Sequence, residues 1–252
     1  KQLSVMFSYG LPDAVGRNPF WAGMEYPGPV QAPPSTPKTL TTVTPSDGQT
    51  MEADVAVVGS GCGGGLIAGK LAQAGKKVIV VELGSYLNES DFVQLELAAY
   101  KSLFLRGGFF NSADGMLAMA SGSTVGGGST VNWSNSLVTP RLVRESWAAA
   151  GLTDVAGQAF DDHLASVMDR MGCNEEVSTQ NEVHNRITEA AAKLGYSYRV
   201  TPLNIDPDSY DPVIAGYSGM GDQTGAKKGT MLTYLQDACD AGATIMPNTR
   251  AD

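Results

Sequence analysis

Two apolar runs flank a run of small residues between residues 53 and 82. The apolar segments 53–58 and 77–82 are short enough to be buried strands, and the small-residue segment 63–74 between them favours a helix. A strand, a helix and a second strand in this order form a βαβ unit, in which both strands run parallel in one sheet. The sequence therefore predicts an α/β fold, with a mixed or parallel sheet flanked by helices.

Helical periodicity is the main pattern in the rest of the chain. Residues 91–105 carry apolar side chains near helical spacing, namely Phe92, Leu95, Ala99 and Leu103. Further helices are expected over residues 140–150, 160–171, 181–194 and 230–241, and a last strand over residues 243–246. Glycines that can end a helix in the left-handed conformation follow three of these segments, at Gly151, Gly172 and Gly195. The chain thus combines a sheet with a partly helical region.

The first fifty residues are rich in proline and glycine and show no sustained hydrophobic period. This composition fits either an extended arm that wraps a surface or a disordered segment. The aromatic residues Phe20, Trp21 and Tyr26 favour an arm anchored to a surface.

The composition argues against several classes of protein. A net charge of −9 and a pI near 4.7 disfavour nucleic-acid binding, which needs clustered Lys and Arg. The longest apolar runs fall far short of the roughly 20 residues that span a bilayer. Three cysteines without a CxxC pair indicate the cytoplasm or another reducing compartment. Peripheral association with a membrane stays open. Two histidines without zinc-ligand spacing give no metal site.

A glycine motif of the GxGxxG type, formed by Gly59, Gly61 and Gly64, lies between the first strand and the first helix. The glycines permit a tight turn, a close approach of backbone to a pyrophosphate and close packing of helix on sheet, and Gly63 lies beside them. Glu82 ends the second strand, where a carboxylate can accept hydrogen bonds from ribose hydroxyls and repel a 2′-phosphate. These residues predict a dinucleotide site, but they do not distinguish FAD from NAD.

A second glycine-rich segment covers residues 120–134 and combines four glycines with six hydroxyl residues. Backbone of this kind can lie against a flat polar cofactor. The alternative is a flexible Gly/Ser linker, which the buried-type residues Val125, Val131 and Trp133 disfavour.

This segment resembles the first signature of the glucose-methanol-choline (GMC) oxidoreductases, and its residues are most similar to those of the long-chain fatty alcohol oxidase branch. The resemblance runs from about Ala53 to the end of the chain, through these matching stretches: 57–61, 107–108, 122–133, 138–140, 170–172, 184–185 and 228–230, with Leu235 and Asp237. It implies a Rossmann-like FAD-binding domain, in which an alcohol gives hydride to flavin N5 while a histidine takes the hydroxyl proton.

The motif and the resemblance together give the predicted FAD-binding residues. They are Gly59, Gly61, Gly63, Gly64, Glu82, Gly122, Gly126, Gly127, Ser129, Asn132, Trp133 and Ser134. The resemblance places the members from Gly126 onward beside the isoalloxazine ring and the pyrophosphate. It also places the catalytic histidine in a C-terminal segment, so we expect the base beyond Asp252 and assign no catalytic residue here.

We divide the chain into four segments on these grounds. They are a Pro/Gly-rich arm over 1–50, the FAD-binding βαβ unit and flavin-contact segment over 51–140, an incomplete, partly helical substrate-side region over 141–222, and a return to the FAD-binding domain over 223–252 that ends where a returning strand should begin. One departure from the branch concerns the substrate. Residues 215–222 lack the cysteines usual there, which leaves the identity of the alcohol open.

The predicted function is FAD-dependent oxidation of the CH–OH group of an alcohol, with a long chain implied by the branch. Two alternatives stay open at this point. One is an NAD-dependent Rossmann dehydrogenase, which would leave the second glycine segment without a role. The other is a catalytically inactive dinucleotide-binding module. Neither the electron acceptor, oxygen or another, nor the oligomeric state follows from the sequence.

Overall fold

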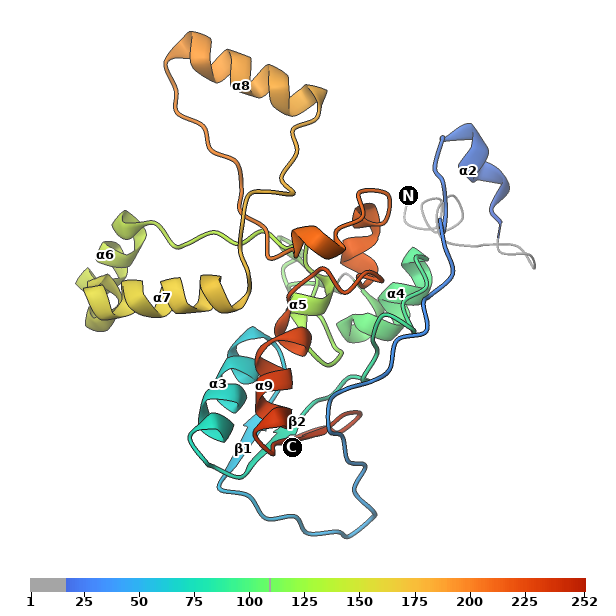
Figure 1. Ribbon diagram of the computed structural model, residues 1–252, viewed down its shortest axis with the longest axis vertical. Coiled ribbons are helices and arrows are strands. Elements are labelled where there is room, and N and C mark those ends of the chain that lie inside the picture. The colour runs from blue at the N-terminus through green and yellow to red at the C-terminus, as the bar shows by residue number, and fades with distance from the viewer. Residues whose placement is uncertain (1–16, 109) are drawn as a thin grey trace. The chain divides into compact units, whose positions relative to one another are not determined.

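The computed structural model describes residues 17–108 and 110–252, which form two compact units (Figure 1). The first unit comprises the described residues up to Trp133 together with residues 211–252, and the second comprises residues 134–210. In the part of the chain that the structure describes, no helix is long and apolar enough to cross a membrane.

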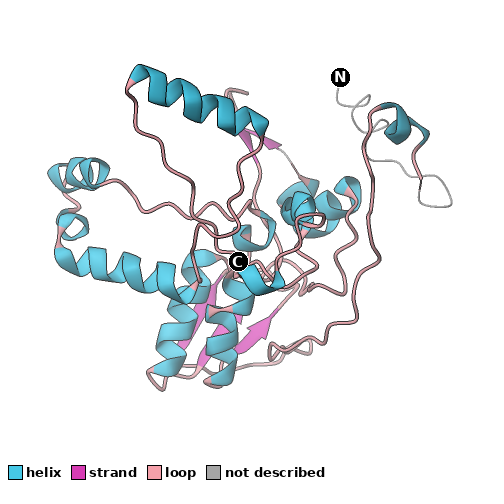
Figure 2. Cartoon of the chain, turned by 45° about the horizontal axis from the view of Figure 1, so that its top comes forward, coloured by secondary structure: helices cyan, strands magenta, loops and turns pink. Residues whose placement is uncertain are grey.

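A parallel three-stranded sheet forms the centre of the first unit. Its strands are β1 (Val55–Val58), β2 (Val78–Val81) and β5 (Thr244–Met246), in the order β1-β2-β5. Helices α3 (Cys62–Gln73) and α9 (Tyr234–Asp240) lie side by side against this sheet (Figures 1 and 2). This arrangement confirms the predicted α/β, Rossmann-like fold and its βαβ unit.

Small residues let α3 and α9 approach closely. Ala68 and Ala72 of α3 are buried in the core with Leu235 and Ala238 of α9. A Cβ atom on Gly69 would lie 2.8 Å from the carbonyl oxygen of Tyr234, closer than real Cβ contacts. The small-residue pattern over residues 63–74 therefore reflects the space available between two helices, as well as the cofactor motif.

Strand β1 is less buried than the sequence predicts. Val57 faces the core, but Val58 is 70% exposed and Ala56 is also exposed. The reason is that β1 pairs only with β2 among the described residues, and α3 and α9 pack on the face that carries Val57. The expectation of a strand buried throughout was therefore wrong.

Helix α4 (Glu96–Leu103) begins five residues later than expected. Gln94 adopts a left-handed backbone conformation with φ of 53°, which a helix cannot contain. Its side-chain amide donates a hydrogen bond to Gln223 Oε1 at 2.8 Å, and its own oxygen accepts one from the amide of Val30 at 2.8 Å. Phe92, from the loop before the helix, is buried in the core nevertheless.

A short turn and a hairpin follow α4. The 3-10 turn η2 covers Leu105–Gly107, and strands β3 (Phe110–Asn111) and β4 (Ala118–Met119) pair antiparallel. The second glycine segment then leads into the four-residue helix α5 (Gly128–Val131).

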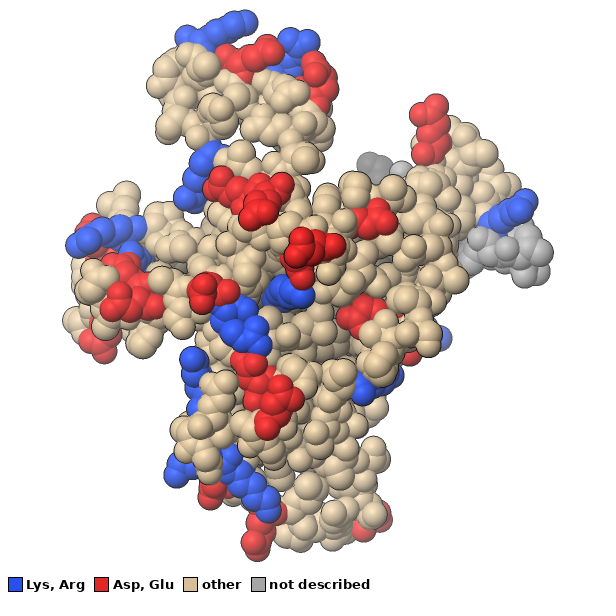
Figure 3. Space-filling model, viewed as in Figure 1, with Lys and Arg blue, Asp and Glu red and all other residues tan. Residues whose placement is uncertain are grey.

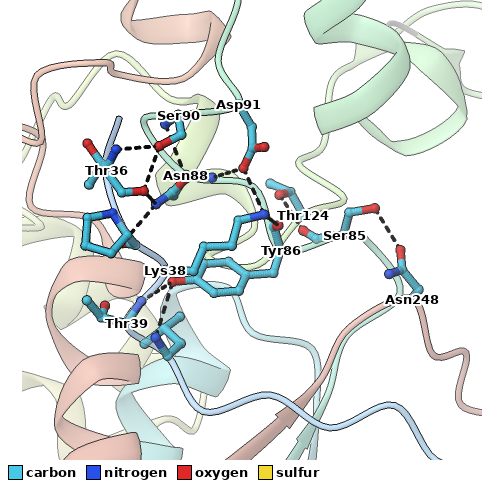
Figure 4. Close-up of polar contacts among 12 residues, drawn as sticks. Thr36, Lys38, Thr39, Ser85, Tyr86, Asn88, Ser90, Asp91, Thr124 and Asn248 are labelled. Atoms are coloured by element: carbon cyan, nitrogen blue, oxygen red, sulfur yellow. Dashed lines mark hydrogen bonds and ion pairs between the residues drawn. The ribbon is translucent and has the colours of Figure 1, made fainter. Parts of the chain in front are cut away.

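The N-terminal arm, described from residue 17, contains helix α2 (Pro19–Gly23) and then runs extended along the first unit. Figure 4 shows its polar contacts with the segment that follows β2. Lys38 forms an ion pair with Asp91 at 3.0 Å, and the Tyr86 hydroxyl accepts a hydrogen bond from the amide of Thr39 at 3.1 Å. Asn88 donates to two carbonyls of the arm. Trp21 is buried as an anchor, whereas Phe20 is 58% exposed.

Two further 3-10 turns and a divided helix complete the first unit. The predicted helix over residues 230–241 consists of a 3-10 turn, η6 (Thr230–Leu232), and α9. Thr233 separates them with φ of −123° and ψ of −98°, and its hydroxyl donates to the Gly229 carbonyl at 2.8 Å. The loop before them contains η5 (Ala215–Met220).

The second unit is mainly helical. Its elements are α6 (Arg141–Ala149), η3 (Thr153–Ala156), α7 (Gln158–Arg170), α8 (Glu182–Leu194) and η4 (Pro207–Ser209). The predicted helices are therefore confirmed to within about two residues. Gly151, Gly172 and Gly195 all have positive φ just beyond the helix ends, as expected. In α6, Arg144 is buried and pairs with Asp161 at 2.6 Å, whereas Trp147 is 43% exposed.

Candidate cofactor and substrate site

The first glycine loop makes a sharp turn between β1 and α3. Gly59 has φ of 87°, a conformation that favours glycine. A Cβ atom on Gly64 would lie 1.9 Å from the Gly59 carbonyl oxygen, so this position excludes any side chain. The N-cap of α3 is Gly61, and no side chain caps the helix. The first turn of α3 therefore leaves its backbone N–H groups and the positive end of the helix dipole for an anion.

The second glycine segment packs directly on the first. A Cβ atom on Gly127, where φ is 52°, would lie 2.8 Å from Cα of Gly61. A Cβ atom on Gly122 would in turn lie 2.4 Å from the carbonyl carbon of Gly127. The two segments, 66 residues apart between Gly61 and Gly127, thus meet backbone against backbone. The structure brings together the glycines that the sequence singled out.

Ser60 joins the two segments to the predicted ribose carboxylate. It is fully buried, and its amide and hydroxyl donate to Glu82 Oε2 at 2.9 and 2.6 Å. The amide of Gly126 donates to the Ser60 hydroxyl oxygen at 3.1 Å. Sequence reasoning missed Ser60, because the second position of the motif carries no general requirement. The only sign of a role for Ser60 in the sequence was a hydroxyl side chain at a motif position that can hold any residue.

Glu82 lies at the end of β2, where the sequence places it. The buried carboxylate accepts a third hydrogen bond at Oε1, from the amide of Gly84 at 2.9 Å. A carboxylate offers about four acceptor positions, so about one is left for a further donor. Glu82 also lines a cavity of about 470 Å³, together with residues at the ends of β1 and β2 and in two loops: Val58, Gly59, Val81, Leu83, Arg106, Thr249, Arg250 and Ala251.

Ser129 and Thr230 connect the second glycine segment to η6. The Ser129 hydroxyl donates to the Gly126 carbonyl at 2.6 Å and accepts from the amide of Thr230 at 3.0 Å. The Thr230 hydroxyl lies 3.3 Å from the carbonyl oxygens of both Ser60 and Gly126. The hydroxyls of Ser129 and Thr230 therefore both shape the loop backbone. From the sequence, Thr230 stood out only as part of a stretch that matches the family.

Lys227 is a second residue that sequence reasoning missed. Its ammonium group donates to the carbonyls of Thr130 at 2.7 Å, Asn132 at 3.0 Å and Ser218 at 2.7 Å. Burial lowers its pKa to about 8. Lys227 connects the end of α5 to η5, and both elements border a large cavity.

That cavity has a volume of about 790 Å³ and a mainly apolar and aromatic wall. Its lining comprises Tyr26, Pro27, Glu96, Tyr100, Phe104, Ala120, Ser121, Gly122, Gly128, Val131, Asn132, Trp133, Val213, Gly216, Tyr217, Gly219 and Met220. Three predicted cofactor residues, Gly122, Asn132 and Trp133, therefore face one cavity. Trp133, expected to be buried, is 61% exposed; it lines the cavity, and its ring lies near Gly219.

Among the described residues that line this cavity, Glu96 alone is acidic. Its Oε1 accepts a hydrogen bond from the Tyr26 hydroxyl. Its Oε2 is buried and has no hydrogen-bond partner among residues 17–108 and 110–252. Burial, and to a smaller extent the charge of Glu96, raise the pKa values of Tyr100 and Tyr217 above their usual range.

Other predicted residues lie apart from these contacts. Ser134 begins the second unit, where its carbonyl accepts hydrogen bonds from Asn204 and Ser136. A Cβ atom on Gly63 would meet nothing within 4 Å. His184 lies in α8 of the second unit, where its amide is capped by Asn181. Over the described ranges, no three His, Cys, Asp or Glu residues cluster in a way that could hold a metal ion.

The charges on the surface are mixed. On the face drawn in Figure 3, Lys and Arg side chains are interspersed with Asp and Glu, and the basic residues do not gather into one continuous patch.

The parallel sheet, the open helix start and the interlocked glycine segments define a Rossmann-like α/β protein. A family model described as GMC oxidoreductase matches residues 100–252. The chain belongs to the GMC oxidoreductase family.

Several curated relatives are similar over most of this chain. The long-chain-alcohol oxidase FAO4B of Arabidopsis thaliana is 35% identical over 203 residues, covering 80% of this chain and 27% of the relative. The uncharacterized GMC-type oxidoreductase y4nJ of Sinorhizobium fredii is 37% identical over 204 residues, covering 80% of this chain and 40% of the relative. The chain thus spans between about a quarter and two fifths of the length of these relatives. The solved structure of pyridoxine 4-oxidase from Mesorbium loti aligns with a TM-score of 0.49 at 19% identity, covering 78% of this chain and 42% of that chain.

Proposed function

We propose that this chain is the FAD-binding part of an oxidoreductase that oxidises the CH–OH group of an alcohol. The observation that carries the proposal is the backbone contact between the two glycine segments, at Gly61 and Gly127, beside a large apolar cavity. A plain NAD-binding unit needs only the first segment. The second segment, which also lines the cavity, fits a cofactor that extends from one site into the other.

The residues present fit FAD. The uncapped start of α3 would hold the pyrophosphate, because its amides and dipole attract anions. The remaining acceptor position of Glu82 would take a ribose hydroxyl. Gly122, Asn132 and Trp133 would lie beside the isoalloxazine ring. FAD, when bound, would supply flavin N5 as the acceptor of hydride from the alcohol carbon.

The protein's own contribution is to fix these groups and exclude water. The hydrogen bonds of Ser60, Ser129 and Lys227 fix the backbone of the second segment. The apolar wall of the cavity would surround an alkyl chain and keep water from the reacting carbon. Its character supports a long-chain alcohol, the substrate class in the names of the Arabidopsis relatives, and those names make oxygen the first electron acceptor to test.

The test is the visible absorption spectrum of the complete protein, purified without added cofactor. We expect flavin bands, release of FAD identified by mass, and loss of the oxidised bands when a long-chain alcohol is added without oxygen. A colourless protein that does not bind added FAD would contradict the proposal, and bound NAD would favour a dehydrogenase. A flavoprotein that no alcohol reduces would leave only the inactive binding module.

A further inference from the structure

We propose that the N-terminal arm sets the preference for chain length, because the ring of Tyr26 forms a wall on which the alkyl chain of the alcohol lies. This inference rests on the proposed function, since it concerns the same cavity. It involves the saturated alkyl chain alone. The hydroxyl group of the alcohol, whose proton leaves in the reaction, is assigned no partner.

The arm supplies a distinct part of the cavity wall. Tyr26 and Pro27 both line the cavity of about 790 Å³. The rest of the lining comes from residues 96–133 and 213–220 of the same unit. The family model matches residues 100–252, so the arm adds a wall that lies outside the match. A preference set by the arm is therefore not predicted by membership of the family alone.

Contacts on both sides of Tyr26 hold the arm at this cavity. The buried ring of Trp21 packs edge to face on the Tyr26 ring, with centroids 5.6 Å apart. A Cβ atom on Gly28 would overlap the same Trp21 ring, so the backbone of the arm lies directly on it. The Tyr217 hydroxyl donates a hydrogen bond to the Gly28 carbonyl. Tyr26 is therefore a fixed part of the wall.

The chemistry of Tyr26 suits an alkyl chain. Its hydroxyl donates to Glu96 Oε1, so its polar end is paired with the carboxylate and its ring is left for an apolar ligand. Tyr100 and Phe104, whose ring centroids lie 5.3 Å apart, line the same cavity. Each methylene group that such a wall removes from water raises affinity about fourfold. A chain long enough to reach Tyr26 would gain this affinity, and a shorter chain would not.

The alternative is that Tyr26 only anchors the arm through Glu96. Two substitutions in the complete protein separate these roles. Tyr26→Phe removes the hydrogen bond but keeps the ring. Tyr26→Ala removes both and uncovers the Glu96 carboxylate, which is a poor surface for an alkyl chain. Phe20→Ala, which removes a 58% exposed ring of the same arm outside the cavity lining, is the matched control.

Titration calorimetry with 2-methyl-2-hexanol, 2-methyl-2-octanol and 2-methyl-2-decanol measures binding of the chain. These tertiary alcohols have no hydrogen on the carbinol carbon, so they cannot give hydride, and binding is measured with or without flavin. We expect wild-type affinity to rise with chain length. In Tyr26→Ala, the longest probe should lose about fourfold or more in affinity relative to the shortest. Tyr26→Phe and Phe20→Ala should keep the wild-type rise.

A chemical label locates the chain without relying on the effect of a smaller side chain. In Tyr26→Cys, we expect 2-methyl-2-decanol to slow alkylation of the introduced thiol by N-ethylmaleimide. In Phe20→Cys, the alcohol should leave the rate unchanged. Mass mapping of peptides distinguishes the introduced thiol from the natural ones at Cys62, Cys173 and Cys239.

Four outcomes would overturn the inference. They are a wild type whose affinity does not rise with chain length, a Tyr26→Ala protein that keeps the rise, a Tyr26→Phe protein that loses as much as Tyr26→Ala, and an alkylation rate in Tyr26→Cys that the alcohol does not change. Neither measurement needs flavin. A protein without FAD would therefore contradict the proposed function and leave these results distinct.

Discussion

At the scale of single residues, the two glycines Gly127 and Gly63 illustrate different requirements. Alanine at Gly127 would adopt a left-handed conformation and place its Cβ 2.8 Å from Cα of Gly61. We expect Gly127→Ala to lower the free energy of unfolding by roughly 2 kcal/mol or more, since conformational strain and the backbone clash add. Urea unfolding of the flavin-free protein measures the change.

Gly63→Ala is the matched control for that substitution. Its Cβ would meet nothing within 4 Å, and its backbone is already helical. The stability of the flavin-free protein should stay the same or rise by up to ~1 kcal/mol. Equal losses from both substitutions would mean that contact between the two glycine segments does not stabilise the fold.

At the scale of elements, Lys227 connects α5 to η5. Lys227→Met keeps much of the side-chain length but removes all three donors to the carbonyls of Thr130, Asn132 and Ser218. Because each buried unsatisfied carbonyl costs about 1–3 kcal/mol, we expect a loss of at least ~2 kcal/mol in urea unfolding and weaker flavin retention. Lys70→Met, at an exposed position of α3, should change neither quantity. A Lys227→Met protein as stable as wild type would show that the carbonyls find other donors.

The lowered pKa of Lys227 gives a second prediction. Burial moves this pKa from 10.5 to about 8, so between these values the folded state releases a proton that the unfolded state keeps. The contribution of Lys227 to the free energy of unfolding therefore rises as pH increases from about 8 to 10.5, by up to ~1.4 kcal/mol per pH unit. This gain is lost again as pH falls back through about 8. Urea unfolding of wild type relative to Lys227→Met isolates this contribution from other titrating groups. A difference that does not change with pH would contradict it.

At the scale of the whole molecule, the parts that the sequence predicted depend on local patterns. The βαβ unit follows from apolar runs and a glycine turn within residues 53–82, and its strands formed in parallel as expected. The predicted start of α4 was wrong because Gln94 forms a side-chain hydrogen bond with Gln223, which lies 129 residues away. The hydrogen bonds of Ser60 and Lys227 also join distant parts of the chain, since Gly126 lies 66 residues from Ser60 and Thr130 lies 97 residues from Lys227. Partners so distant leave no periodic signal in the sequence.

The coupling of cofactor to fold is the remaining prediction at this scale. A ligand that binds only the folded state stabilises it by about 2.7 kcal/mol at a concentration of 100 Kd. If the two glycine segments form one FAD site, removal of flavin should lower the melting temperature of the complete protein, and added FAD should restore it. NAD should raise it less, because its nicotinamide ring is much smaller than an isoalloxazine ring and would contact less of the cavity lined by Asn132 and Trp133. Gly127→Ala should lose most of the response to FAD, because the contact at Gly61 would open. An equal rise in melting temperature with NAD would instead mean that the first segment binds the nucleotide alone.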